Sequence, residues 1–172
     1  KKLKNDFISN IDKNQYGFKP KSSTTCAMLD IQDYITSQLT KSSTIAIAVL
    51  TIDFSKAFDR IDHTILIEKL RKLKSSENKT INTNFIKWLQ VYLKDRKQIV
   101  RVNSSCSEAI NITSGVPQGS SLSPYLFSLF VTDLQSKISH VVKFADDKTL
   151  LFTLTKENIN EDLKVVESEI RN

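Results

Sequence analysis

The segment from Thr44 to Phe54 constrains the fold of this chain more than any other part of the sequence. It is almost entirely apolar and rich in β-branched residues, which is typical of a strand buried on both faces. Asp53 stands near its end, and a carboxylate at the rim of an apolar strand is costly unless a positive partner meets it. A capping role is the simple alternative for Asp53 taken alone. The pattern predicts a core strand that delivers an acidic group to its end.

A second acidic feature lies between two further apolar segments. The sequence from Val141 to Thr153 predicts two strands that meet at Asp146 and Asp147. Aspartate is common in tight turns, so a solvated hairpin turn is the simple alternative. If these strands lie beside the first one, Asp53 comes next to Asp146, close enough to share a metal ion.

Carboxylates gathered in this way have a specific chemistry. Hard cations such as Mg²⁺ prefer oxygen ligands and keep water or substrate phosphates in their other positions. Two such ions about 4 Å apart stabilise the attacking and leaving oxygens in phosphoryl transfer. Because neighbouring strand residues point to opposite faces, we expect one of Asp146 and Asp147 to be a full ligand and the other a weaker one.

The loop from Ser114 to Ser120 is the third feature of interest. It holds two of the three glycines of the chain and Pro117. Glycine lets the backbone approach a ligand closely, and proline fixes the bend. Gln118 could reach a sugar or a base edge, whereas the alternative is a plain connection between a strand and a helix.

The remaining pattern completes an α+β fold, with an antiparallel sheet and helices packed on one of its faces. Trp88 and Tyr92 lie on a helical stripe and are predicted to be core residues. Asp62 is predicted to cap the helix that follows it. Besides the strands above, helices are predicted at Ser23–Leu39, after Asp62, around Phe85–Tyr92, and at Ser121–Ile138 and Lys156–Ile170, with a strand pair at Gln98–Val102 and Ala109–Ile112.

Composition narrows the class of protein. The 172 residues are 40% hydrophobic and hold no apolar run near the roughly 20 residues of a membrane span, so no membrane partner is expected. Cys26 and Cys106 lack a metal-type spacing, which fits a reduced intracellular protein. The net charge of +6 favours phosphate backbones as partners, with an affinity that falls as salt rises. A merely soluble lysine-rich protein is the alternative that charge alone leaves open.

The motifs together resemble those of a known family. Asp53-Phe54-Ser55-Lys56-Ala57-Phe58-Asp59, then Ser114–Ser120 continuing to Pro124-Tyr125-Leu126-Phe127, then Phe144-Ala145-Asp146-Asp147 are similar to three successive palm motifs of reverse transcriptases. The residues at these motif positions resemble those of non-LTR, LINE-like retrotransposons. Tyr16-Gly17-Phe18-Lys19, with Ser23-Thr24-Thr25, resembles the fingers motif that precedes them. The resemblance runs in order over about residues 14 to 170.

The resemblance implies roles for individual residues. Asp53, Asp146 and Asp147 match the catalytic carboxylates that bind two Mg²⁺ ions, with Mn²⁺ as a possible substitute. Phe58 matches the aromatic gate beneath the incoming sugar. The remaining residues assigned to nucleotide binding are Phe54, Gln118, Gly119, Lys19 and Lys21.

Four of these assignments depart from the family pattern or have a structural alternative. Lys19 stands where an arginine is usual, and Pro20 replaces the glycine before the second basic position, Lys21. Phe54 and Phe58 could instead be core residues, and this alternative is the stronger one for Phe54.

The implied activity is RNA-directed DNA polymerisation, in which a primer 3′-hydroxyl attacks the α-phosphate of a deoxynucleotide. The implied partners are an RNA template, a DNA primer and dNTPs. A viral RNA polymerase shares the palm, but it usually has an acid where Phe58 stands, and a ring at that position excludes a ribose 2′-hydroxyl. The rival hypothesis is an inactive retroelement remnant that only binds nucleic acid.

The resemblance also suggests how the chain is organised. Residues 1–43 are expected to be a partial fingers region and residues 44–172 a palm region, within one reverse transcriptase domain that is incomplete at both ends. An isolated fragment of this kind is expected to be weakly active or inactive. The expected location is intracellular, in the nucleus or the cytoplasm.

Overall fold

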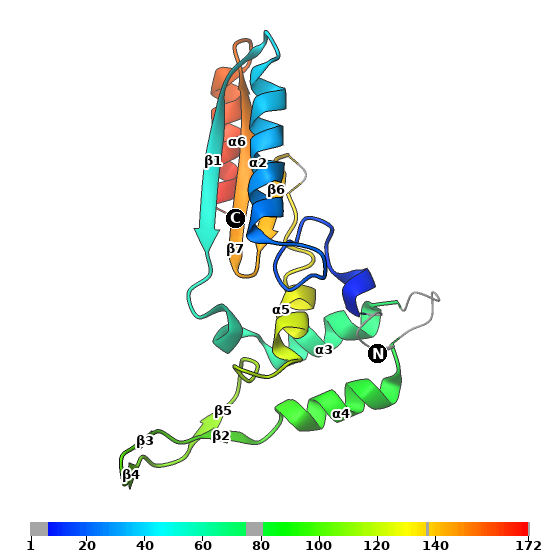
Figure 1. Cartoon of the computed structure of the whole chain (residues 1–172), viewed down its shortest axis with the longest axis vertical. Coiled ribbons are helices and arrows are strands. Elements are labelled where there is room, and N and C mark those ends of the chain that lie inside the picture. Colours follow the sequence, from blue (N-terminus) through cyan, green and yellow to red (C-terminus); the bar gives the residue numbers. More distant parts are fainter. Residues whose placement is uncertain (1–6, 75–80, 137, 172) are drawn as a thin grey trace. The chain divides into compact units, whose positions relative to one another are not determined.

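A computed structural model describes residues 7–74, 81–136 and 138–171 (Figure 1). The chain divides into two compact units. The first unit consists of the described parts of residues 1–11 and 56–132, and the second consists of those of residues 12–55 and 133–172. This division by packing differs from the predicted division at residue 43, which concerns functional regions and stays a prediction.

The second unit is built on a three-stranded antiparallel sheet. Its strands are β1 (Thr44–Asp53), β6 (His140–Phe144) and β7 (Asp147–Thr155), in the order β1-β7-β6. All three strands were expected from the sequence, and their antiparallel pairing confirms the predicted α+β class.

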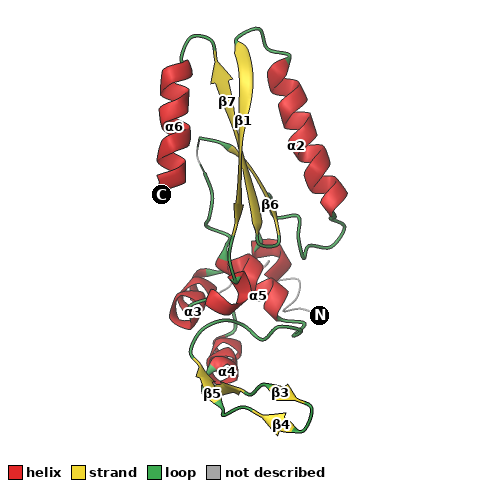
Figure 2. Ribbon diagram, turned by 90° about the vertical axis from the view of Figure 1, so that its left-hand side faces the viewer, coloured by secondary structure: helices red, strands yellow, loops and turns green. Residues whose placement is uncertain are grey.

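Helices cover both faces of this sheet rather than one, so the one-sided arrangement predicted from the sequence is wrong. Helix α2 (Thr24–Leu39) packs on the face that presents Val142 and Leu151. Helix α6 (Ile159–Arg171) packs on the face that presents Leu150 and Phe152. Figure 2 shows the sheet nearly edge-on between the two helices. Alternate residues of β7 are apolar on both faces, and each face therefore needs its own cover.

Strand β1 is less buried than its composition predicts. The side chains of Ile45 and Val49 are 48% and 53% exposed, although a strand buried on both faces was expected. In the described part of the chain β1 pairs only with β7, so it is an edge strand. An apolar run therefore did not distinguish an edge position from a central one.

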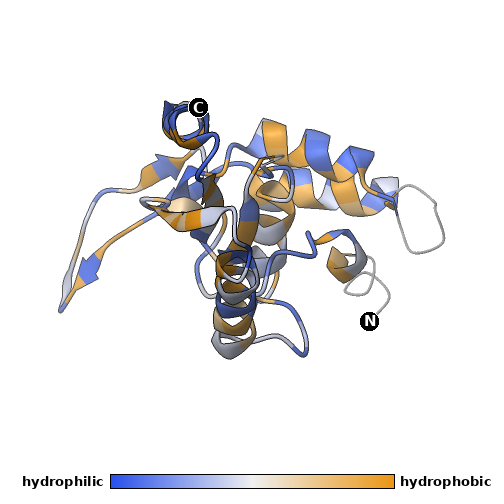
Figure 3. Ribbon diagram, turned by 90° about the horizontal axis from the view of Figure 1, so that it is seen from above, coloured by the Kyte–Doolittle hydropathy of each residue, from blue (hydrophilic) through white to orange (hydrophobic). Residues whose placement is uncertain are grey.

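Side-chain hydrogen bonds fix the first turn of each helix of this unit. Ser23 caps α2, and its side chain accepts a hydrogen bond from Cys26 N, which satisfies one of the donors at the helix start. Asp162 of α6 accepts two hydrogen bonds from Thr155 and so ties the helix to the end of β7. In Figure 3, the helix at the C label is seen end-on and carries both hydrophilic and hydrophobic residues, as expected of a helix that covers one face.

The first unit is mainly helical. It contains η1 (Ala57–Arg60), α3 (His63–Lys72), α4 (Thr83–Leu93) and α5 (Ser123–Phe130). Asp62 caps α3 by accepting hydrogen bonds from Thr64 N and Ile65 N, as predicted. The core of this unit comprises Phe7, Ile11, Ile61, Leu66, Ile67, Leu70, Ile81, Ile86, Leu89, Leu93, Val116, Leu126, Phe127, Leu129 and Val131.

Two predictions for the aromatic stripe of α4 have different outcomes. Tyr92 is partly buried against this core, in agreement with the prediction. Trp88 is 51% exposed and stacks on Tyr92 with a centroid distance of 5.1 Å, so its assignment to the core is wrong. The stripe is wider than the buried face of the helix, and Trp88 lies at its margin.

Helix α5 is shorter than the predicted segment Ser121–Ile138, part of which (residue 137) lies outside the described residues. It ends at Phe130, whose carbonyl accepts a hydrogen bond from the Lys69 ammonium. Val131, Thr132 and Asp133 follow, and all three have low helix propensity.

The predicted strand pair near residues 98–112 is split in two. Strand β2 (Arg96–Gln98) pairs with β5 (Ile110–Ile112), and β3 (Arg101–Val102) pairs with β4 (Ser105–Cys106). The prediction was therefore right about a hairpin and wrong about its continuity.

Candidate active site

Two of the predicted acidic residues are direct partners across the sheet. The register of β1 and β7 pairs Asp53 with Asp147, and the register of β6 and β7 pairs Asp147 with Phe144. Because directly opposite residues of an antiparallel pair project from the same face, the carboxylates of Asp53 and Asp147 share the end of one face. This face is also the one that α2 covers further along the strands.

Asp146 lies in the turn between β6 and β7, one residue before the strand begins. The strand partner of Asp53 is thus Asp147, whereas Asp146 was expected there. Ala145 begins the turn with a φ of 54°, a left-handed conformation that costs a non-glycine residue about 1–2 kcal/mol. Strand alternation does not govern a turn residue, so the turn geometry sets the direction of Asp146.

The three carboxylates suit a hard divalent cation in their chemistry. Asp53 and Asp147 are exposed and Asp146 is partly buried, and all three offer the oxygen donors that Mg²⁺ prefers. Among residues 7–74, 81–136 and 138–171, however, no three acidic, histidine or cysteine side chains converge closely enough to hold a metal ion. The described arrangement is one facing pair with a third carboxylate beside it.

Two lysines are buried on the opposite face, directly behind the acidic end of the sheet. Lys143 and Lys148 are cross-strand partners and are only 2% and 9% exposed. Burial lowers the pKa of Lys148, the charge of Glu169 opposes this shift, and the charge of Lys143 adds to it. This buried basic pair could not be predicted from the sequence, because lysine is seldom buried.

The loop Ser114–Ser120 belongs to the first unit and is held against η1. Gly115 N donates to Ile61 O at 2.8 Å and Val116 N donates to Phe58 O at 2.9 Å. His63 Nε2 donates a hydrogen bond to the carbonyl oxygen of Gly115 at 2.7 Å. A contact to a backbone carbonyl leaves no motif in the sequence, so this bond could not be predicted.

The backbone of Gly115 leaves no room for a side chain. Its φ is +81°, and a Cβ atom there would lie 2.7 Å from the backbone of Asp59. Gly119 has the same φ, but apart from its own chain neighbours no atom of the described residues lies within 4 Å of its Cβ position. The first glycine therefore serves packing, whereas the second leaves an open surface that a ligand could approach.

Gln118 is exposed and already has a partner in the protein. Its Nε2 donates to Asp59 Oδ1 at 3.0 Å, and the hydroxyl of Ser114 donates to Asp59 O at 2.9 Å. Asp59 thereby orients the predicted nucleotide-contacting amide. Sequence reasoning missed this role because the two residues lie far apart in the chain.

The two predicted aromatic residues of the nucleotide site have different surroundings. Phe58 is partly buried and stacks on Phe127 of α5 with a centroid distance of 4.6 Å, so it packs on the core of the first unit. Phe54 is partly buried in the second unit. Packing on one side is compatible with a gate as well as with a core residue, so both roles of Phe58 stay predictions.

Lys19 and Lys21 lie in an irregular segment before α2. Lys19 Nζ donates to Lys13 O at 3.4 Å, and Lys21 is exposed with a φ of 60°. Their predicted role in nucleotide binding stays a prediction.

A polar cleft of about 690 Å³ opens beside the loop of the first unit. Its lining includes the basic residues Lys56, Arg96 and Lys97 as well as Gln118. Arginine and lysine on a concave surface attract phosphate groups. The cleft was not predicted, because strand β2 brings Arg96 and Lys97 to the loop only in the folded chain.

A palm-type polymerase fold is what the solved structures indicate. Apo telomerase from Candida tropicalis, truncated of its C-terminal domain, matches 93% of this chain with a TM-score of 0.63 at 18% identity, over 32% of that structure. Telomerase from Candida albicans, in complex with a fragment of telomeric RNA, matches 97% with a TM-score of 0.62 at 18% identity, over 30% of that structure. At this identity the likeness establishes the fold alone.

The family is established by sequence. The model of the reverse transcriptase (RNA-dependent DNA polymerase) family matches residues 1–172, and the chain belongs to this family. The resemblance to non-LTR elements is confirmed by relatives from transposons and mobile elements.

Three relatives illustrate this relationship. A probable RNA-directed DNA polymerase from transposon BS of Drosophila melanogaster is 36% identical over 59% of this chain. The RNA-directed DNA polymerase from mobile element jockey of Drosophila funebris is 28% identical over 83%, and a Pol polyprotein from the type-1 element R2 of Popillia japonica is 29% identical over 80%. The matched regions span 12%, 14% and 20% of these proteins.

Among the described residues, no helix combines the length and apolar character needed to cross a membrane.

Proposed function

We propose that this chain supplies the metal-binding and nucleotide-selecting parts of an RNA-directed DNA polymerase. The observation that carries the proposal is the facing pair Asp53 and Asp147 at the adjacent ends of β1 and β7, with Asp146 in the turn beside them. These carboxylates stand at the three positions that the family resemblance assigns to catalysis.

Asp53, Asp146 and Asp147 would hold the divalent ions, Mg²⁺ or Mn²⁺. Bound ions of this kind neutralise charge on the attacking and leaving oxygens of phosphoryl transfer. The carboxylates do not converge as a set of three in the described residues. Water and nucleotide phosphates would therefore fill the remaining coordination positions of the ions, as is usual for Mg²⁺.

The first unit supports the nucleotide and the template in this proposal. Gln118, oriented by Asp59, and the open backbone of Gly119 would contact the incoming nucleotide. Phe58 would exclude the 2′-hydroxyl and so select dNTPs. Phe54, Lys19 and Lys21 are also proposed to bind the nucleotide, on the family resemblance that assigned them.

The basic cleft that contains Lys56, Arg96 and Lys97 would attract the backbone of the RNA template or the DNA primer. Binding through phosphate contacts should weaken steeply as salt rises. In this proposal the protein acts on nucleic acid inside the cell, in the nucleus or the cytoplasm.

Primer extension on a homopolymer RNA template with Mg²⁺ or Mn²⁺ tests the function. The assay should use the 172-residue chain and, in parallel, a chimaera in which this chain replaces the corresponding segment of the jockey polymerase. We expect the chimaera to extend the primer with dNTPs, and we expect Asp146→Asn to reduce its rate at least about a hundredfold because the divalent ion that would neutralise transition-state charge loses a ligand. Asp33→Asn, an exposed acid on α2, is the matched control and should leave the rate unchanged.

The rival hypothesis predicts another outcome. An inactive remnant would bind RNA–DNA hybrids in a salt-dependent manner, and neither the chain nor the chimaera would extend the primer. Extension that persists in Asp146→Asn would contradict the assignment of the carboxylates.

A further inference from the structure

The buried side chain of Gln15 holds the turn that carries the catalytic aspartates. Gln15 is 1% exposed. Its Nε2 donates to Ala145 O at 3.1 Å, and its Oε1 accepts hydrogen bonds from Ala145 N at 3.0 Å and from Gly17 N at 2.9 Å. One amide therefore binds both backbone polar groups of the residue immediately before Asp146.

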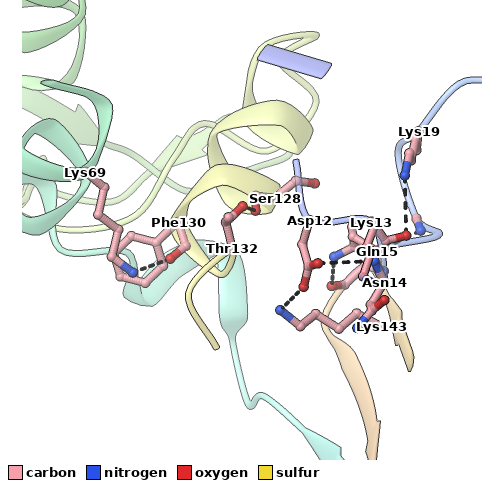
Figure 4. Close-up of polar contacts among 12 residues, drawn as sticks. Asp12, Lys13, Asn14, Gln15, Lys19, Lys69, Ser128, Phe130, Thr132 and Lys143 are labelled. Atoms are coloured by element: carbon pink, nitrogen blue, oxygen red, sulfur yellow. Dashed lines mark hydrogen bonds and ion pairs between the residues drawn. The ribbon is translucent and has the colours of Figure 1, made fainter. Parts of the chain in front are cut away.

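The segment around Gln15 is itself fixed to strand β6. Gln15 forms a parallel bridge with Lys143, in which Lys143 N donates to Asn14 O and Tyr16 N donates to Lys143 O, each at 2.8 Å. An ion pair of 2.9 Å between Lys143 Nζ and Asp12 Oδ2, both nearly fully buried, adds a side-chain link (Figure 4). The residue that clamps the turn is thus anchored on the neighbouring strand.

Gly17 brings the same segment into direct contact with the turn. A Cβ atom on Gly17 would lie 2.2 Å from Ala145 N and 2.9 Å from Ala145 Cα. No side chain fits at that distance, so only glycine permits this approach. The segment from Gln15 to Gly17 therefore lies flush against the backbone of Ala145.

The turn needs such support because of its conformation. Ala145 has a φ of 54°, and a strained backbone persists only where the surrounding structure fixes it. The Ala145 carbonyl belongs to the peptide bond that leads into Asp146, so the hydrogen bond from Gln15 Nε2 fixes the orientation of that peptide. The two bonds to Ala145 thereby set where the Asp146 carboxylate can point.

We propose that Gln15 is a positioning residue for the catalytic carboxylates: it locks the strained turn so that Asp146 and Asp147 keep their placement relative to Asp53. The inference rests on the proposed function for its consequence in metal binding. Partners that orient metal ligands typically change metal affinity by 10–100-fold when they are removed. Gln15 would act through the backbone of Ala145, without touching the metal or the nucleotide.

Two variants of Gln15 separate its hydrogen bonds. Gln15→Met keeps the length of the side chain and removes all three bonds, whereas Gln15→Glu keeps an acceptor for the two N–H groups and loses the donor to Ala145 O. Gln32→Met, an exposed glutamine on α2, is the matched control. All variants are compared as the 172-residue chain at a temperature well below unfolding.

The first measurement is amide hydrogen exchange by NMR, which reports local opening. In Gln15→Met we expect exchange at Ala145 and Gly17 to rise at least about tenfold, while the amide of the core residue Leu150 keeps its wild-type rate. Wild-type exchange at Ala145 in this variant would overturn the inference. A uniform rise at all three amides would also overturn it, because it would mean general destabilisation.

The second measurement is Mn²⁺ binding in the presence of a dNTP, followed by electron paramagnetic resonance. We expect the affinity to fall about tenfold in Gln15→Met, to fall less in Gln15→Glu and to be unchanged in Gln32→Met. Wild-type affinity in Gln15→Met would overturn the positioning role.

The two measurements keep the inference distinct from the proposed function. If Asp53→Asn binds Mn²⁺ as tightly as the wild-type chain does, the proposed function fails. The exchange at Ala145 then still decides whether Gln15 locks the turn.

Discussion

The acidic end of the sheet and the loop Ser114–Ser120 place their predicted functional residues by different physical means. In the sheet, backbone register sets Asp53 opposite Asp147. In the loop, Gln118 is held by a hydrogen bond from its side chain to Asp59, and Gly115 by contacts with the backbone of η1. Both regions depend on one glycine packed against backbone, Gly17 in the second unit and Gly115 in the first.

This difference teaches which part of each region is sensitive to change. A strand register is shared among many backbone bonds and tolerates the loss of one side chain. A turn or a loop held by a few side chains and one close backbone contact does not. The most damaging substitutions should therefore lie beside the predicted catalytic residues, at the groups that support the backbone.

The largest effect on stability is expected at the buried ion pair. Lys143→Met leaves Asp12 buried and without its cation, and breaking such a pair by removing one partner costs about 3–5 kcal/mol. Urea unfolding of the 172-residue chain measures this loss. Lys164→Met, at an exposed lysine of α6, should change stability by less than about 0.5 kcal/mol.

The double variant Asp12→Leu/Lys143→Met provides the control for this prediction. Replacing both charges of a buried pair by apolar groups is often neutral, so most of the lost stability should return. A double variant as unstable as Lys143→Met would contradict the prediction that the loss of stability comes from the unpaired charge of Asp12.

The next effect compares two glycines with the same φ. Gly115→Ala should cost about 3 kcal/mol, because it adds a backbone clash to the strain of a left-handed residue. Gly119→Ala should cost only about 1–2 kcal/mol, because its surroundings are open and the strain alone remains. Denaturant unfolding of both variants checks the order, and equal losses would remove the packing role assigned to Gly115.

A smaller effect, on selectivity, tests Phe58. Phe58→Val in the jockey chimaera should raise the ratio of rNTP to dNTP incorporation about tenfold, equivalent to about 1.4 kcal/mol in the barrier, because room opens for a 2′-hydroxyl. The ratio of kcat/KM values for the two sugars is the measurement. An unchanged ratio with lower stability would make Phe58 a core residue that stacks on Phe127 and nothing more.

The smallest effect concerns pH. Burial and the hydrogen bond to Asp30 raise the pKa of Tyr16 to about 12, above the usual value near 10. The folded state holds this proton more tightly than the unfolded state, so the contribution to stability is present below about pH 10 and is lost as pH rises toward about 12. Stability measured by urea unfolding should fall more steeply across this range in the wild type than in Tyr16→Phe; parallel curves would contradict the shift.

The sequence was sufficient for features that leave a local pattern. The apolar segments around Asp53 and Asp146 predicted three strands, and Ser23 and Asp62 predicted helix starts, because these signals depend on neighbouring residues. The motif spacing predicted the family. Two apolar strands with an acidic residue at the end of each also predicted that the acids would gather at one end of the sheet.

Features that depend on distant contacts could not be predicted in this way. The clamp of Gln15 on Ala145 joins residues 130 positions apart, and the bond of Gln118 to Asp59 joins residues 59 apart. The exposure of Val49 and the second helical cover of the sheet depend on which elements become neighbours. The register that pairs Asp53 with Asp147, in place of Asp146, depends on a turn whose strained residue is alanine and so carries no turn signal.

The most direct test of the central claim is the dependence of Mn²⁺ binding on the facing carboxylates. Mn²⁺ is titrated into the 172-residue chain with a dNTP present, and the free ion is followed by electron paramagnetic resonance in the wild type and in Asp53→Asn, Asp147→Asn and Asp33→Asn. If Asp53 and Asp147 form a metal site, each of their variants should bind at least about tenfold more weakly, and Asp33→Asn should match the wild type. Equal affinity in all four proteins would contradict the account.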